Sequence, residues 1–131
     1  MPNLPKPKRP AYLPAPAPRK RSPAQMEAAK FYNCQRWRST TKRYRAANPL
    51  CEACAHVDEL EPAAVTDHVV PISAGGSPYE VDNFMPLCHR HHNRKRAYEL
   101  RGYVTSTVQG LDGLLPADRA AVLDKLEPRR S

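Results

Sequence analysis

Residues 66–95 read TDHVVPISAGGSPYEVDNFMPLCHRHHNRK, and the rest of the chain can be understood from this stretch outward. It holds four of the five histidines and one of the four cysteines of the 131-residue chain. Asp67 and His68 stand near its start, Asn83 lies in its middle, and Cys88 opens a histidine-rich cluster at its end. Packing alone does not require so many ligand-type side chains in so short a window, so the stretch indicates metal chemistry.

The first half of the stretch predicts a strand and a loop. β-Branched residues flank Asp67 and His68 over residues 64–70, which favours a strand that ends at Pro71. Two adjacent glycines and a Ser-Pro pair predict a loop over residues 73–82. Neighbouring side chains on a strand point to opposite faces, so Asp67 and His68 share a site only if the strand bends.

The second half predicts another strand and a helix. Residues 83–87 read as a short strand, and Pro86 places it at an edge or in a bent ribbon because proline lacks a backbone donor. The sequence is helical in composition from His89, and Gly102 is a plausible stop. Together with the first strand, these segments predict a β-β-α unit and an α+β fold.

Two pairs of residues, one before the stretch and one inside it, have the spacing of zinc ligands. Cys51 and Cys54 form a C-x-x-C knuckle, and Cys88 and His91 form a C-x-x-H pair that begins 34 residues after Cys54. Four such ligands hold a tetrahedral structural zinc, and a chain with one tryptophan and two phenylalanines has a thin core that a metal would brace. A redox pair, or disulfides in a secreted protein, would explain Cys51 and Cys54 but not the histidines. Cys34 has no near partner in the sequence, and we interpret it as a packed free thiol.

Charge is distributed unevenly along the chain. Residues 1–47 hold twelve Lys/Arg and one acid, whereas residues 48–131 hold nine Lys/Arg and twelve acids. The basic part favours a polyanion as partner, with nucleic acid ahead of a membrane surface, although a merely solvated tail has the same composition. No apolar run approaches the roughly 20 residues of a membrane span or forms a signal peptide, so a cytoplasmic protein is expected.

The flanking segments suggest three parts. Residues 1–22 are rich in proline, lysine and arginine and predict a disordered basic arm. Residues 23–102 would form the domain, starting with a helix that Ser22 caps and that continues to residue 47 with a break near Asn33. Residues 103–131 would form a C-terminal extension, with a short strand at 104–108 and an amphipathic helix at 116–126 that packs onto the core or, alternatively, docks a partner protein.

At Asp67-His68, Asn83 and His92 the chain resembles the HNH endonuclease family, also called ββα-metal nucleases. The flanking sequences DHVVPISAGG, NFMPLC and HNRK and the Cys51-Cys54 knuckle also stand where that family places them, and the Trp37 helix that runs into NPLC is similar to phage and prophage members. The resemblance covers about residues 32–101. It implies a small ββα-metal domain with an N-terminal helix and a zinc knuckle.

The resemblance also implies roles for individual residues. Asp67 and His92 would bind one catalytic divalent cation (Mg²⁺, Mn²⁺ or Ni²⁺), His68 would be the general base that activates water, and Asn83 would brace the loop that aims His68. Structural zinc would be held by Cys51, Cys54, Cys88 and His91. Many family members have a cysteine where His91 stands, and the closeness of His91 to His92 leaves an exchange of their metal roles open.

Basic residues surround the predicted site. Arg90, Arg94, Lys95 and Arg96 on the final helix could hold phosphates, although each could also belong to a solvated face. We expect His89 on the surface or facing DNA, and His56 exposed.

The leading interpretation is a phage-type metal-dependent DNA endonuclease in the cytoplasm of a bacterial host. Terminase or other packaging proteins are partners that only the family suggests. The alternative is a non-catalytic zinc-knuckle DNA-binding module, against which the complete Asp67, His68, Asn83 and His92 set argues.

Overall fold

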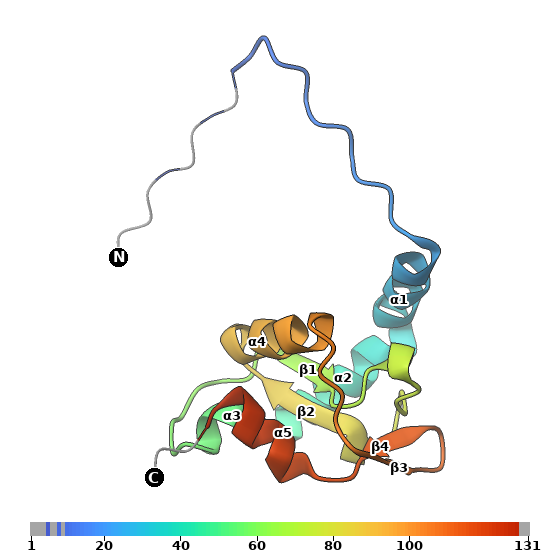
Figure 1. Cartoon of the computed structure of the whole chain (residues 1–131), viewed down its shortest axis with the longest axis vertical. Helices are drawn as coiled ribbons and strands as arrows, with labels where there is room; N and C mark the ends of the chain where they lie inside the picture. The colour runs from blue at the N-terminus through green and yellow to red at the C-terminus, as the bar shows by residue number, and fades with distance from the viewer. Residues whose placement is uncertain (1–4, 6–7, 9, 129–131) are drawn as a thin grey trace.

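Residues 66–95 fold into a hairpin and a helix in a computed structural model that describes residues 5, 8 and 10–128. Strand β1 (Val65–His68) pairs antiparallel with β2 (Phe84–Leu87), and helix α4 (His89–Leu100) follows and lies across the hairpin (Figure 1). Within the described residues β2 pairs with β1 alone, which makes the missing N–H of Pro86 tolerable. The predicted β-β-α unit and the α+β class are confirmed.

The loop between the strands is tightly built. It contains two single-turn 3₁₀ helices, η1 (Ile72–Ala74) and η2 (Val81–Asn83). Gly75 ends η1 with a φ of +88°, a left-handed conformation that favours glycine. A Cβ on Gly76 would lie 1.8 Å from the carbonyl oxygen of Val70, so the chain returns close to the end of β1 only because this residue has no side chain. The predicted glycine turn is confirmed.

Two consecutive helices precede the hairpin. Helix α1 (Pro23–Asn33) starts with a capping box between Ser22 and Gln25, as predicted. Cys34 ends α1 and caps α2 (Gln35–Ala47), because its backbone is extended and its sulfur accepts from the amide of Trp37. The break predicted near Asn33 is therefore present, and it lets the two helices change direction (Figure 1).

The hydrophobic core lies between the hairpin, the cysteine knuckle and the C-terminal helix. Helix α3 (Glu52–Ala55) carries the knuckle, and α5 (Arg119–Leu126) packs beside it (Figure 1). The buried members of this core are Cys51, Ala53, Cys54, Val69, Met85, Leu87, Val122, Leu123 and Leu126. The C-terminal helix thus contributes to the same core as the β-β-α unit, as its amphipathic pattern predicted.

The segment before α5 differs from the prediction. Strands β3 (Thr107–Gln109) and β4 (Leu114–Pro116) form a second hairpin, where the sequence suggested one strand at residues 104–108. Strand β4 was missed because long-range bonds hold it: Leu114 exchanges backbone hydrogen bonds with Gly75 and Ser77 of the glycine loop. Helix α5 starts three residues later than predicted, after Asp118 caps it.

The N-terminal arm lies partly outside the described residues, which omit 1–4, 6–7 and 9. Residues 10–22 are exposed, contain a turn but neither helix nor strand, and extend away from the domain (Figure 1). The arm and the predicted domain limits at 22/23 and 102/103 stay predictions. Among the described residues, none of the helices combines the length and apolar character that crossing a bilayer would need.

Candidate active site and metal cluster

Three cysteines and one histidine converge at the junction of α3, β2 and α4. The ligand atoms of Cys51, Cys54, Cys88 and His91 all lie within 4.8 Å of one another. His91 Nδ1 is 3.5, 3.4 and 3.3 Å from the three sulfurs, and the sulfurs of Cys54 and Cys88 are 3.9 Å apart. Ordinary zinc bond lengths in a tetrahedron require about 3.6 Å between nitrogen and sulfur and about 3.8 Å between sulfurs. The four residues therefore fit a zinc ion.

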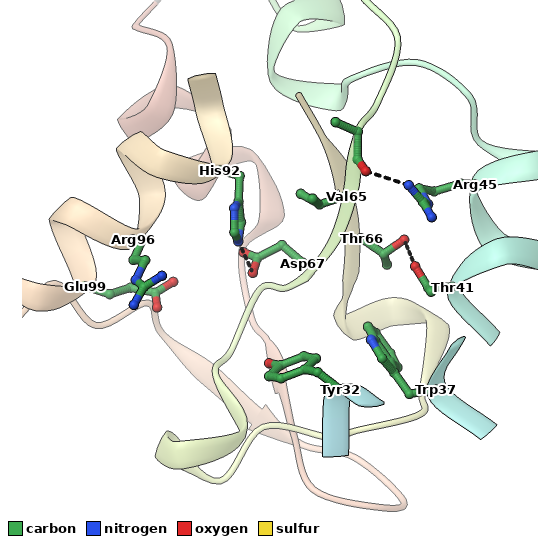
Figure 2. Close-up of a pocket in the computed structure, with 11 residues that line it drawn as sticks. Tyr32, Trp37, Thr41, Arg45, Val65, Thr66, Asp67, His92, Arg96 and Glu99 are labelled. Carbon is green, nitrogen blue, oxygen red and sulfur yellow. Dashed lines mark hydrogen bonds and ion pairs between the residues drawn. The ribbon is translucent and has the colours of Figure 1, made fainter. Parts of the chain in front are cut away.

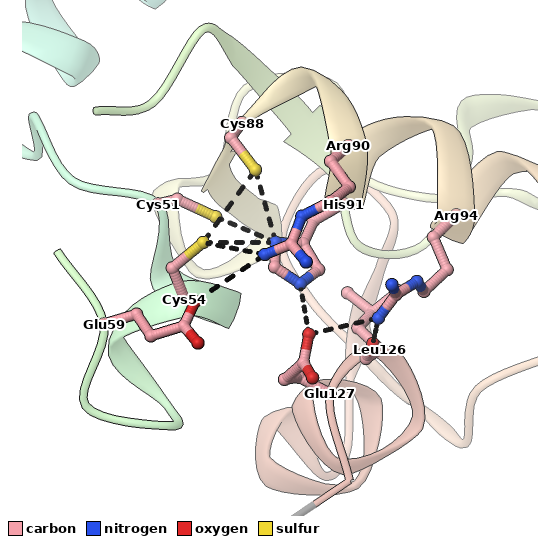
Figure 3. Close-up of polar contacts among 9 residues, drawn as sticks. All are labelled: Cys51, Cys54, Glu59, Cys88, Arg90, His91, Arg94, Leu126 and Glu127. Carbon is pink, nitrogen blue, oxygen red and sulfur yellow. Dashed lines mark hydrogen bonds and ion pairs between the residues drawn. The ribbon is translucent and has the colours of Figure 1, made fainter. Parts of the chain in front are cut away.

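A carboxylate supports the histidine of this cluster. His91 is fully buried, and its Nε2 lies 2.7 Å from the carboxylate of Glu127, which follows α5 (Figure 3). The hydrogen bond with His91 holds the pKa of Glu127 below its usual value, and Arg94 adds to the effect. A carboxylate on the second nitrogen directs Nδ1 toward the thiols and strengthens a histidine as a ligand. Glu127 was missed in the sequence because it lies 36 residues away and no local pattern connects it to His91.

His92 lies on the other side of α4 and faces β1. Its Nε2 is 3.8 Å from Oδ1 of Asp67, and the two side chains are 32% and 18% exposed (Figure 2). The structure thus places His91 in the cysteine cluster and His92 with Asp67. This is the assignment expected from the sequence, and the exchange of the two histidines finds no support in the geometry.

Asp67 and His92 open onto a pocket of about 530 Å³. Its walls come from α1, α2, β1 and α4, and include Tyr32, Arg45 and Arg96 (Figure 2). Two protein ligands at the wall of an open pocket leave coordination positions free for other groups, unlike the closed cysteine cluster. The pair therefore fits a divalent cation that also contacts a substrate.

His68 points away from this pocket into an aromatic environment, as alternation along β1 predicts. It is 2% exposed, and its ring stacks on Trp37 with centroids 4.5 Å apart. Nε2 is 3.0 Å from the carbonyl oxygen of Pro78, which can only accept, so Nε2 carries the proton and Nδ1 is free to accept one. Burial lowers the pKa of His68, which keeps the ring neutral near pH 7.

The unprotonated Nδ1 of His68 contacts the hydroxyl of Tyr32. The Tyr32 hydroxyl lies 3.4 Å from Nδ1 and occupies the acceptor position of the histidine, and Tyr32 also lines the pocket. Burial raises the pKa of Tyr32 to about 12, with the Asp67 charge adding to the effect, so the hydroxyl keeps its proton and donates it. The sequence did not single out Tyr32, because its proximity to His68 depends on how α1 packs.

Asn83 braces the loop as the resemblance implied. It is fully buried; its amide nitrogen donates to the carbonyls of Val70 (3.0 Å) and Ser77 (2.8 Å), and its side-chain oxygen accepts from the amide of Val70 (2.8 Å). These bonds fix the end of β1 against the segment that carries Pro78, the partner of His68.

Replacing Asn83 by alanine is expected to destabilise the fold by roughly 2–4 kcal/mol, because it leaves buried backbone groups without partners. Chemical denaturation of the two proteins measures the difference. Asn83→Asp is the matched comparison: it retains the acceptor for the Val70 amide but loses both donors. A midpoint unchanged by Asn83→Ala would contradict the bracing role.

The four basic residues predicted to hold phosphates do not share one face. Lys95 is 2% exposed and its ammonium lies 2.7 Å from Asp67, so its predicted surface contact with phosphate is wrong. Arg94 donates to the backbone of Leu126 (2.6 Å) and to Glu127, and Arg90 pairs with Glu59 beside the cysteine cluster (Figure 3). Of these four residues, only Arg96 lines the Asp67–His92 pocket. The helical repeat causes this separation, since α4 contacts both sites with opposite sides.

Of the two remaining histidines, His89 is as exposed as expected and His56 is not. His56 was expected to be exposed, but its side chain is only 10% exposed and its Nε2 lies 2.6 Å from Asp124 of α5. The packing of α5 beside α3 covers it. Cys34 is a half-buried free thiol whose sulfur lies 3.7 Å from the Tyr79 hydroxyl, as the sequence suggested.

A β-β-α unit that presents an Asp/His pair to a pocket, beside a Cys₃His cluster, defines the ββα-metal class of fold. Comparison with known proteins agrees. Residues 51–97 match the family model described as HNH endonuclease. The crystal structure of the HNH endonuclease of the deep-sea thermophilic bacteriophage GVE2 with manganese ion is similar at 29% sequence identity and a TM-score of 0.50, over 60% of this chain and 88% of that chain. No curated protein matches. The family model over residues 51–97 and the similar phage structure support the HNH resemblance, and they support a nuclease in general terms.

Proposed function

We propose that this protein is a metal-dependent DNA endonuclease that hydrolyses phosphodiester bonds. The observation that carries the proposal is the pair of Asp67 Oδ1 and His92 Nε2, 3.8 Å apart at the wall of an open pocket. Ligand bonds of about 2.1 Å from each atom can meet at one Mg²⁺, Mn²⁺ or Ni²⁺ ion across this separation. Such a cation offsets the negative charge that builds on a phosphate during hydrolysis.

His68 is the proposed general base. Its neutral ring offers Nδ1 as acceptor, while the bond from Nε2 to Pro78 fixes the tautomer and the ring orientation. The water that attacks phosphorus must reach Nδ1, so the Tyr32 hydroxyl has to move aside when DNA binds. Tyr32 is suited to this movement because it is 44% exposed and lies one residue before the end of α1.

DNA reaches the site over a basic surface. Arg96 and Arg45 line the pocket from α4 and α2. Residues 1–47 supply most of the positive charge of the chain. Contacts of this kind hold phosphates and carry no base information, so cleavage with little sequence preference is expected.

The Cys₃His cluster is proposed to hold a structural zinc that fixes α4, and with it His92, against the hairpin. Cys51 and Cys54 lie within this cluster with His91, which favours a metal over a redox pair. The similarity to a bacteriophage enzyme supports a phage-type nuclease. The further proposal of action in a bacterial cytoplasm during phage DNA packaging, with terminase or other packaging proteins as partners, rests on the family resemblance alone.

Changes to the two proposed cation ligands test the function. Asp67→Asn and His92→Ala are each expected to reduce cleavage of supercoiled DNA at subsaturating Mn²⁺ by at least 100-fold, because the cation loses one of two protein ligands. His89→Ala, an exposed histidine three residues before His92 on the same helix, is the matched control and should cut within a fewfold of wild type. Wild-type rates in both ligand variants would remove the basis of the proposal.

A further inference from the structure

Lys95 is a buried ammonium with three oxygen partners. Its Nζ lies 2.7 Å from Oδ2 of Asp67 and 3.1 Å from the carbonyl oxygen of His68, and it also contacts the carboxylate of Glu99. Burial alone lowers the pKa of Lys95, but the charges of Asp67 and Glu99 outweigh it and raise the pKa, so the group is charged. The ammonium donates hydrogen bonds to the His68 carbonyl and to Glu99, and it forms an ion pair with Oδ2 of Asp67, which has no other polar partner among the described residues. These three contacts hold the side chain in the interior and away from a phosphate.

The position of Lys95 affects what Asp67 can offer to a cation. Oδ1 of Asp67 faces His92, whereas Oδ2 is held by the ammonium. Glu99 lines the same pocket as Asp67 and His92, and it is a third potential ligand there. Lys95 lies between the two carboxylates and neutralises one of their charges.

We propose that Lys95 is a positioning residue that keeps the cation site at two protein ligands, by holding Oδ2 of Asp67 and the carboxylate of Glu99 away from the cation. This inference rests on the proposed function of the Asp67–His92 pair. A site with fewer protein ligands and less negative charge binds a cation more weakly but leaves more positions for phosphate and water. Without Lys95, the freed Asp67 oxygen and Glu99 would join the site.

The test measures Mn²⁺ binding to the zinc-loaded full chain without DNA. Affinity comes from titration followed by electron paramagnetic resonance, and pulsed resonance in ¹⁷O-labelled water counts the bound waters. A six-coordinate ion with two protein ligands keeps roughly four waters. Lys95→Met is expected to bind Mn²⁺ at least about tenfold more tightly, because a positive charge near the ion is removed. It is also expected to lose at least one bound water, because Glu99 or the freed Asp67 oxygen takes that coordination position. Lys42→Met makes the same change at an exposed lysine on α2 and should leave both values unchanged.

A second pair of variants shows whether Glu99 is the added ligand. Lys95→Met with Glu99→Gln should return the affinity and the water count toward wild-type values. Tighter binding in Lys95→Met that persists unchanged in the double variant, or no tightening at all, would overturn the inference while leaving the proposed nuclease intact. If wild type itself binds no Mn²⁺ outside the cysteine cluster, the proposed cation site fails, and the inference fails with it.

Should Lys95→Met fail to fold, Glu99→Gln alone decides the question. The proposal expects Mn²⁺ affinity within about threefold of wild type and roughly four waters, because Glu99 is not a ligand while Lys95 is present. A loss of tenfold or more in affinity, together with a gained water, would show that Glu99 already binds the cation, and would refute the proposed role of Lys95.

Discussion

Replacing His68 by alanine is expected to slow DNA cleavage by roughly 10²–10⁴-fold, the range over which a positioned general base acts. Single-turnover rates at saturating DNA and Mn²⁺ measure the effect on chemistry without the effect on binding. Mn²⁺ affinity should stay near wild type, because the proposed cation ligands are Asp67 and His92, and the His68 side chain points away from them.

A matched variant separates loss of the base from loss of packing. His68 stacks on Trp37, so alanine also opens a cavity. The glutamine side chain in His68→Gln can still donate to the carbonyl of Pro78 but cannot take up a proton at pH 7, so this variant should be as slow as His68→Ala. Cleavage by His68→Gln within tenfold of wild type would show that this residue only orients the site.

Removal of the proposed zinc from the Cys₃His cluster is expected to unfold the domain. Cys51 and Cys54 belong to the buried core, and the cluster joins α3 to the start of α4, so without metal three thiols would lose their ligand bonds at the centre of the fold. Structural zinc contributes about 10–16 kcal/mol of apparent binding energy in small zinc domains, more than a fold of this size has in reserve. Stripping with a chelator, or Cys88→Ser, should abolish the cooperative thermal transition followed by the near-ultraviolet signal of Trp37.

Cys34→Ser provides the control for the zinc prediction. Cys34 is a free thiol that caps α2 outside the cluster, and serine is a better helix cap, so stability should change by less than about 1 kcal/mol and zinc content should stay the same. Metal analysis and thermal melts of both variants give the comparison. A Cys88→Ser protein that melts within a few degrees of wild type would contradict a structural role for the cluster.

Local sequence signals predicted the elements that local physics determines. The capping box at Ser22, the break near Asn33 and the glycine turn at Gly75 all depend on residues close in the sequence, and the structure contains each of them. The Cys₃His grouping was also predictable, because ligand spacing of this kind is restrictive.

The environment of the site depends on tertiary packing and was not predictable. In the sequence, Lys95 is one of several basic residues on a polar helix. It lies three residues after His92 and four before Glu99, and this helical spacing could have suggested a shared site. Tyr32 and Glu127 gave no such signal, because the packing of α1 and α5 brings them to their histidines.

The most direct test of the account is cleavage of supercoiled plasmid by the zinc-loaded wild-type chain, with and without added Mg²⁺, Mn²⁺ or Ni²⁺. We predict nicked or linear product only when a divalent cation is added, and none after its chelation at intact zinc content. A protein that holds zinc and binds the plasmid but cuts under none of these conditions would contradict the nuclease and would favour a zinc-knuckle DNA-binding module instead.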